Sequence, residues 1–98
     1  MARITWTDQA LEDLDAICEF IARDAPRYAQ VFADRIFESV ERLESFPKSG
    51  RMVPELEIET LREIIFGNYR IVYRITDNEV EILTVFHGSK LLDFTKLT

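Results

Sequence analysis

Two tight turn signals constrain the fold of this chain more than any other feature of its sequence. The dipeptides Gly67-Asn68 and Asp77-Asn78 each separate two stretches that are rich in β-branched and aromatic residues. Two-residue connections of this kind are typical of β-hairpins. The sequence therefore predicts a three-stranded antiparallel meander, whose strands are residues 60–66, 69–76 and 79–86.

Two-residue turns also fix which residues oppose each other across the predicted strands. Ile64 is expected opposite Ile71, and Tyr69 opposite Phe86, so that one face of the sheet becomes almost wholly apolar. A sheet face of this kind must be covered, and helices are its expected cover. Its residues are Ile64, Phe66, Tyr69, Ile71, Tyr73, Ile75, Val80, Ile82 and Phe86.

The opposite face of the predicted sheet mixes charged and apolar side chains. In this register Arg74 opposes Glu81, while Glu63 and His87 both lie diagonal to Arg70, within reach of long side chains. Contiguous apolar residues on the free face of a monomer usually mark a partner site. The residues predicted to form such an exposed patch are Ile65, Val72, Leu83 and Val85.

The first half of the chain predicts one short strand and a helix hairpin. Residues 4–6 alternate between apolar and polar, as in a strand, and Thr7 is placed to cap a following helix. Apolar residues then recur every three or four positions along two segments, with Pro26 opening the second helix and Pro47 following its end. The predicted fold class is α+β, with the helix hairpin packed on one face of the meander.

Residues 48–55 combine a glycine, a proline and several polar side chains, which predicts a loop. Glu55, Glu57 and Glu59 indicate that this loop continues at the surface, and Arg51 within it is either a solvated charge or a partner of Glu55. At the other end of the chain, apolar residues suggest a short docked segment. These residues are Leu91, Leu92, Phe94 and Leu97.

The charge balance argues against nonspecific nucleic-acid binding by the whole surface. Lys and Arg number 12 against 18 Asp and Glu, a formal net charge of −6, whereas nucleic-acid affinity depends largely on phosphate neutralisation by cations.

No apolar run approaches the roughly 20 residues that cross a bilayer, so a cytoplasmic protein without a membrane partner is expected. One histidine and one cysteine far apart in sequence predict no metal site, and three glycines predict no phosphate-binding loop. No cofactor is expected.

The order of the elements and several short motifs resemble the ParE/RelE toxin family. The motifs are Trp6-Thr7, Phe46-Pro47, residues 50–55, Arg62-Glu63, residues 68–74 and residues 85–88. The sequence Tyr-Arg-Ile-Val-Tyr-Arg at residues 69–74 is the most specific of them. The resemblance covers nearly the whole chain and implies a single toxin domain over residues 1–98. It also implies a cognate antitoxin as partner, ParD-like or another small DNA-binding protein, encoded beside the toxin.

The resemblance implies two possible targets for such a toxin, and it also leaves open a degenerate member or one that binds another partner. RelE-like members cleave messenger RNA on the ribosome, whereas ParE-like members inhibit DNA gyrase without a known hydrolytic site. RNA cleavage needs a base, an acid and positive charge near the scissile phosphate. Arg70 matches the arginine of the family's central strand, and His87 matches a late histidine of some ribonuclease members, but the late tyrosine of those members is absent. Together with the acidic charge, this favours a gyrase inhibitor over the alternative, a ribosome-dependent endoribonuclease.

The charged residues of the predicted sheet also have a purely structural interpretation. Arg70 and Arg74 could form a solvated ladder with Glu63 and Glu81, and His87 could simply donate to a backbone carbonyl at the end of its strand. Arg70 and His87 remain the candidates for catalysis if the chain is an enzyme. The residues predicted to bind the target or the antitoxin are Arg51, Arg62, Glu63, Arg70, Arg74, His87 and Lys90.

Overall fold

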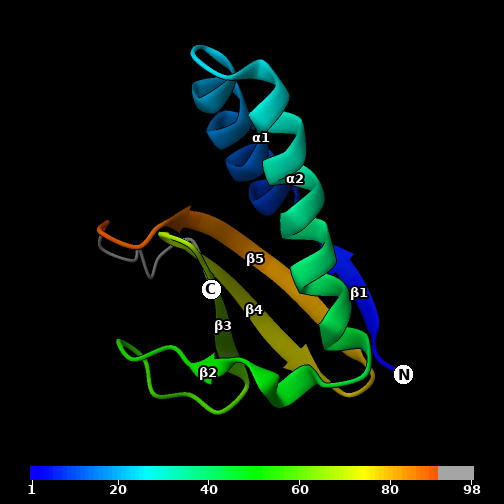
Figure 1. Cartoon of the computed structure of the whole chain (residues 1–98). Helices are drawn as coiled ribbons and strands as arrows, with labels where there is room; N and C mark the ends of the chain where they lie inside the picture. The colour runs from blue at the N-terminus through cyan, green and yellow to red at the C-terminus, as the bar shows by residue number, and fades with distance from the viewer. Residues whose placement is uncertain (91–98) are drawn as a thin grey trace.

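Two helices pack as a hairpin on one face of a β-sheet (Figure 1). A computed structural model describes residues 1–90, and within them the sheet has five strands in the order β1-β5-β4-β3-β2. The predicted α+β fold is confirmed, while the predicted docked segment at residues 91–97 lies outside the described residues. The elements are β1 (Arg3–Trp6), α1 (Asp8–Ala22), α2 (Pro26–Glu41), β2 (Arg51–Met52), β3 (Leu61–Phe66), β4 (Tyr69–Thr76) and β5 (Glu79–His87).

The helices begin where the sequence predicts. The Thr7 side chain caps α1 by accepting a hydrogen bond from the backbone N–H of Ala10, and the same hydroxyl donates to the carbonyl of Ile82 at 2.8 Å. Pro26 lies in the first turn of α2, where a missing N–H breaks no helical hydrogen bond. The Thr7 contact ties the start of α1 to β5, next to the parallel pairing of β1 with β5.

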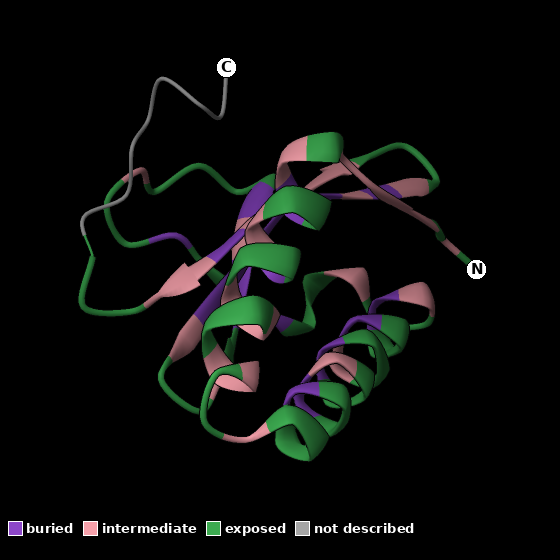
Figure 2. Ribbon diagram, turned by 90° about the horizontal axis from the view of Figure 1, so that it is seen from above, coloured by how far each residue is buried: buried purple, intermediate pink, exposed green. Residues whose placement is uncertain are grey.

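The hydrophobic core lies between the helix hairpin and the sheet (Figure 2). Leu14 of α1 and Phe32 and Ile36 of α2 are buried there with Ile71 and Tyr73 of β4. Burying one such large apolar side chain is worth about 1.5–3 kcal/mol relative to leaving it exposed. The helices therefore cover one face of the sheet.

Strand β2 is a correction to the predicted loop. Residues 51 and 52 pair with β3, with Arg51 opposite Glu63 and Met52 opposite Arg62. A strand of two residues has no detectable alternation in the sequence, and it forms because the longer β3 offers it an open edge. The pairing brings Arg51 onto the sheet face that points away from the helices.

Strand β5 carries a β-bulge that the sequence does not predict. Near the turn, Tyr73 opposes Ile82 as predicted, but the next pair is Val72 with Thr84, which leaves Leu83 as an extra residue. An extra residue in one strand moves every later side chain of that strand to the opposite face.

The predicted faces of β5 are therefore wrong beyond the bulge. Val85 lies in the core under the helices. Phe86 packs on the face of the sheet that points away from the helices, here called the far face. His87 opposes Tyr69, so the predicted diagonal approach of His87 to Arg70 is also wrong.

The far face of the sheet is covered by the chain itself. Of the four apolar residues predicted to form an exposed patch there, Ile65 alone is exposed, and Val72 is fully buried. The prediction of an open apolar patch is therefore wrong, because the segment between β2 and β3 folds back over the sheet. The far-face cluster consists of Val53, Leu61, Val72 and Leu83, with Leu56 and Phe86 packed against it.

The buried hydroxyl of Tyr73 attaches the segment after α2 to the sheet. It donates to the carbonyl of Pro47 at 2.6 Å and accepts from the backbone N–H of Gly50 at 3.0 Å. Burial raises the pKa of Tyr73. A Cβ at position 50 would lie 2.6 Å from the Tyr73 hydroxyl and from the carbonyl oxygen of Glu63, so glycine is required for this close approach.

Replacing Tyr73 by phenylalanine should lower the free energy of unfolding by about 1–3 kcal/mol, because buried groups at Pro47 and Gly50 would lose a partner. Tyr69→Phe is the matched control, since the Tyr69 hydroxyl has no hydrogen-bond partner within residues 1–90, and its cost should stay within about 0.5 kcal/mol. Urea denaturation followed by circular dichroism measures both values. Equal losses in the two variants would contradict the anchoring role of Tyr73.

Candidate functional site

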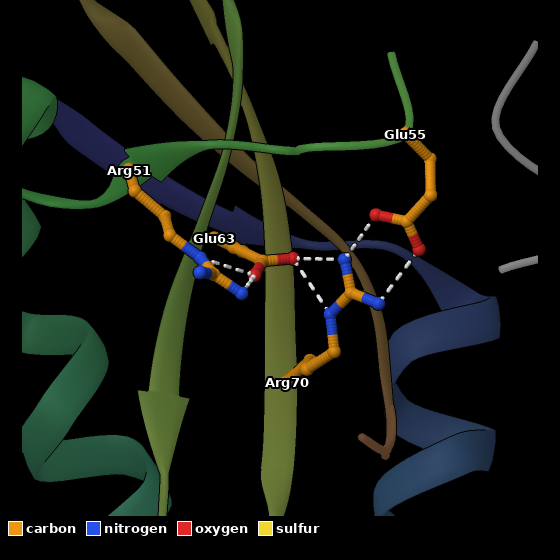
Figure 3. A network of polar contacts seen from close by, with 4 residues as sticks. All are labelled: Arg51, Glu55, Glu63 and Arg70. Carbon is orange, nitrogen blue, oxygen red and sulfur yellow. Dashed lines mark hydrogen bonds and ion pairs between the residues drawn. The ribbon is translucent and has the colours of Figure 1, made fainter. Parts of the chain in front are cut away.

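Four charged residues form one connected network on the far face of the sheet (Figure 3). Arg70 of β4 donates from Nε to Oε1 of Glu63 on β3 at 2.8 Å. Arg51 of β2 donates from Nε to the other oxygen of the same carboxylate, also at 2.8 Å. The carboxylate of Glu63 therefore bridges two arginines that come from different strands.

Glu55 closes the network from the segment that follows β2. Nη1 of Arg70 donates to Oε2 of Glu55 and Nη2 donates to Oε1, both at 2.7 Å. Such a bidentate pair is stronger and more specific in geometry than a single hydrogen bond. The ring of Phe86 packs on the guanidinium, with 5.0 Å between Cζ and the ring centroid. The charged end of Arg70 is thus held by two carboxylates and one aromatic ring.

The network is buried at its centre and open at its ends. The exposed fraction of the side chain is 0% for Glu63, 10% for Arg70, 30% for Glu55 and 58% for Arg51. The hydrogen bonds from Arg70 lower the pKa of Glu55, and the carboxylates of Glu55 and Glu63 raise the pKa of Arg70. Buried charges are tolerated when they are paired and hydrogen-bonded, and here two arginines balance two glutamates.

Part of this network was predicted and part was not. The diagonal contact between Glu63 and Arg70 is confirmed, but Arg70 is buried, so its interpretation as a solvated ladder residue is wrong. Arg51 pairs with Glu63 and not with Glu55. The contact of Glu55 with Arg70 was not predicted, because the sequence carries no signal that this loop turns back over the sheet.

Arg62 and Arg74 have separate partners outside this network. Arg62 donates from Nη1 to the carbonyl of Gly50 at 2.9 Å, which supports the segment leading into β2. Arg74 pairs with Glu81 across β4 and β5 at 3.3 Å, as the predicted register requires. Both arginines therefore have structural partners.

His87 and Lys90 lie near the end of the described residues. The Nδ1 atom of His87 is 2.7 Å from the hydroxyl oxygen of Ser89, and its ring packs edge-on against Tyr69, with 5.4 Å between ring centroids. Lys90 is exposed. The structure does not bring His87 into the network of Arg70.

Within residues 1–90, no cluster of His, Cys, Asp and Glu side chains has a composition and spacing that could hold a metal ion. The thiol of Cys18 is partly buried, and its pKa is raised by burial and by the nearby Asp15. None of the helices described between residues 1 and 90 is long and apolar enough to cross a membrane.

The order of elements and the sheet topology agree with one known family. Residues 4–92 match the family model for the ParE toxin of the type II toxin–antitoxin system parDE. The chain belongs to this toxin family. The resemblance to ParE/RelE toxins that the sequence motifs indicated is thereby confirmed.

Two curated relatives and two solved structures are similar to this ParE-family chain over most of its length. Toxin RelE2 of Caulobacter vibrioides is 36% identical over 92 residues, which cover 93% of this chain and 100% of the relative. Putative toxin Y4kP of Sinorhizobium fredii is 41% identical over 88 residues, 88% of each chain. A structure of the chromosomal ParDE system from P. aeruginosa has a TM-score of 0.76 at 26% identity, and the match covers 89% of this chain and 96% of the solved chain. The RelBE2 toxin–antitoxin complex from Mycobacterium tuberculosis has a TM-score of 0.56 at 26% identity, and the match covers 88% of this chain and 96% of the solved chain.

Replacing Arg70 by alanine should lower the free energy of unfolding of this ParE-family toxin by about 3–5 kcal/mol, because the buried carboxylate of Glu63 would lose its buried partner. Arg3→Ala is the control, because its ion pair with Glu79 is 3.7 Å long and the Arg3 side chain is 80% exposed, so its loss should cost at most about 1 kcal/mol. Urea denaturation at neutral pH measures both. Equal small losses would mean that the network does not stabilise the fold in solution.

Proposed function

We propose that this chain acts in the cytoplasm on DNA gyrase and is neutralised by a cognate antitoxin encoded beside it. The observation that carries the choice of target is the engagement of Arg70 by Glu55 and Glu63. A ribonuclease would need this arginine near the scissile phosphate, where its positive charge stabilises the transition state. In the free protein a phosphate would have to compete with two carboxylates that already hold the guanidinium.

The position of His87 supports the same choice. Arg70 opposes Phe86 on the far face, whereas His87 opposes Tyr69, whose ring contacts Phe32 of α2 on the helix side. A general acid or base must lie within hydrogen-bond reach of the reacting group. With the two candidates on opposite faces of the sheet, a toxin that acts by binding a protein target is favoured over one that cleaves RNA.

The charge of the chain favours a protein target as well. A net charge of −6 opposes close approach to ribosomal RNA, because like charges repel and few counterions would be released. Gyrase offers protein surfaces on which an acidic toxin can bind. The ribosome-dependent endoribonuclease remains the second candidate, since one similar relative carries the name Toxin RelE2.

The solved relatives support the proposed antitoxin. One is described as a ParDE system and the other as a RelBE2 toxin–antitoxin complex. A ParD-like antitoxin, or another small DNA-binding antitoxin, is therefore the partner that we propose for this chain. The exposed network residue Arg51 and the exposed Ile65 lie on the far face where such a partner could bind.

Induced expression of the chain in a bacterial host should produce filamentous cells with DNA-damage signalling, and co-expression of the neighbouring antitoxin gene should relieve the growth arrest. The purified chain should inhibit supercoiling by purified gyrase. His87→Gln should keep both activities, because glutamine preserves hydrogen bonding but cannot transfer a proton as imidazole does near neutral pH. Early cleavage of messenger RNA in the ribosomal A site, lost in His87→Gln, would contradict this target and support the endoribonuclease.

A further inference from the structure

The segment of residues 54–58, here called the strap, covers the far face of the sheet with only two of its side chains. Glu55 binds Arg70, and Leu56 packs against the far-face cluster that contains Val72 and Leu83. The other residues of the strap are exposed, including Glu57 and Ile58. The strap is therefore attached through one acidic and one adjacent apolar side chain.

The backbone of the strap contributes little to this attachment. The N–H groups of Leu56 and Glu57 both donate to the carbonyl of Val53, and the carbonyl of Ile58 accepts from Leu61, so these hydrogen bonds are local. Glu57 has φ +52°, the left-handed region that a residue with a side chain adopts at a cost. The contacts of Glu55 and Leu56 thus hold a short loop in an unfavourable conformation.

The site under the strap has the charge and shape to accept another chain in its place. Without Glu55, the two arginines and Glu63 carry one net positive charge, and the outer edge of the Arg70 guanidinium needs one carboxylate. Glu63 is fully buried, but Glu55 is partly exposed, so a carboxylate from outside can reach Arg70 along the same direction. Ile65 opposes Arg70 and is 49% exposed, which leaves apolar surface that the strap does not cover.

We propose that Glu55 and Leu56 act as internal placeholders in a docking site for an acidic residue followed by a large aliphatic residue in a partner polypeptide. The partner segment binds the guanidinium of Arg70, covers Val72 and Ile65, and displaces the strap. We assign the segment to the cognate antitoxin, which rests on the proposed function, whereas the site itself depends only on the contacts of the strap.

The test uses the full chain with Glu55→Ala/Leu56→Ala, which vacates the site, and Glu57→Ala/Ile58→Ala, which removes the same residue types from the exposed part of the strap. The probe is a synthetic peptide with the sequence of residues 53–60, blocked at both ends. A second peptide carries glutamine in place of all its glutamates. Isothermal titration calorimetry measures the affinity of each chain for each peptide.

The vacated variant should bind the acidic peptide at least about tenfold more tightly than the unmodified chain or the control variant, because a tethered segment competes at an effective concentration in the millimolar range. The glutamine peptide should bind far more weakly. Equal affinities in the three chains would overturn the proposal. Failure of the vacated variant to fold would also overturn it, because the strap would then be an essential part of the core.

The purified antitoxin should displace the acidic peptide from the vacated variant. Absence of displacement would overturn the assignment of the partner segment to the antitoxin. The peptide measurements contain neither gyrase nor antitoxin, so their outcome is independent of the proposed target. A failure of gyrase inhibition and a failure of the docking site can therefore be told apart.

Discussion

The buried ion pair between Glu63 and Arg70 is the interaction on which the far side of the molecule depends. The carboxylate of Glu63 is fully buried and the guanidinium of Arg70 is nearly so. Such buried charges are stable only if each has oppositely charged, hydrogen-bonded partners. Arg51 supplies the second partner of Glu63, which brings β2 to the edge of β3. Glu55 supplies the second partner of Arg70, which brings the strap over the sheet. One buried pair thereby organises two segments that have few regular backbone hydrogen bonds.

The contacts with Glu55 and Glu63 change the role that is expected of Arg70, the arginine in the central strand β4. From the family resemblance, Arg70 could have been a catalytic charge, yet its hydrogen-bonding groups face carboxylates of its own chain. An arginine held in this way is suited to exchange one carboxylate for another, because the bidentate geometry is the same for any carboxylate. The same residue can therefore stabilise the free toxin and recognise an acidic partner.

Local signals in the sequence were sufficient for most of the fold. Two-residue turns gave the pairing of Ile64 with Ile71, and Thr7 gave the start of α1, because both depend on neighbouring residues only. The bulge at Leu83 was not predictable, since no glycine marks it and the apolar residues Leu83 and Val85 are buried on different faces of the sheet. The return of Glu55 to Arg70 was not predictable either, because the two residues lie 15 positions apart and the loop between β2 and β3 includes a left-handed residue, Glu57, of a type that gives no sign of it.

The exchange of the guanidinium Nε–H of Arg70 with water, measured by NMR on the unmodified chain near neutral pH, tests the buried network most directly. Arg51 is the internal reference, because its Nε–H donates to the same carboxylate of Glu63 but its side chain is 58% exposed. We expect a distinct Arg70 signal that exchanges much more slowly than that of Arg51 and becomes fast in Glu63→Gln. An Arg70 Nε–H that exchanges as fast as that of Arg51 in the folded protein would contradict the buried ion pair.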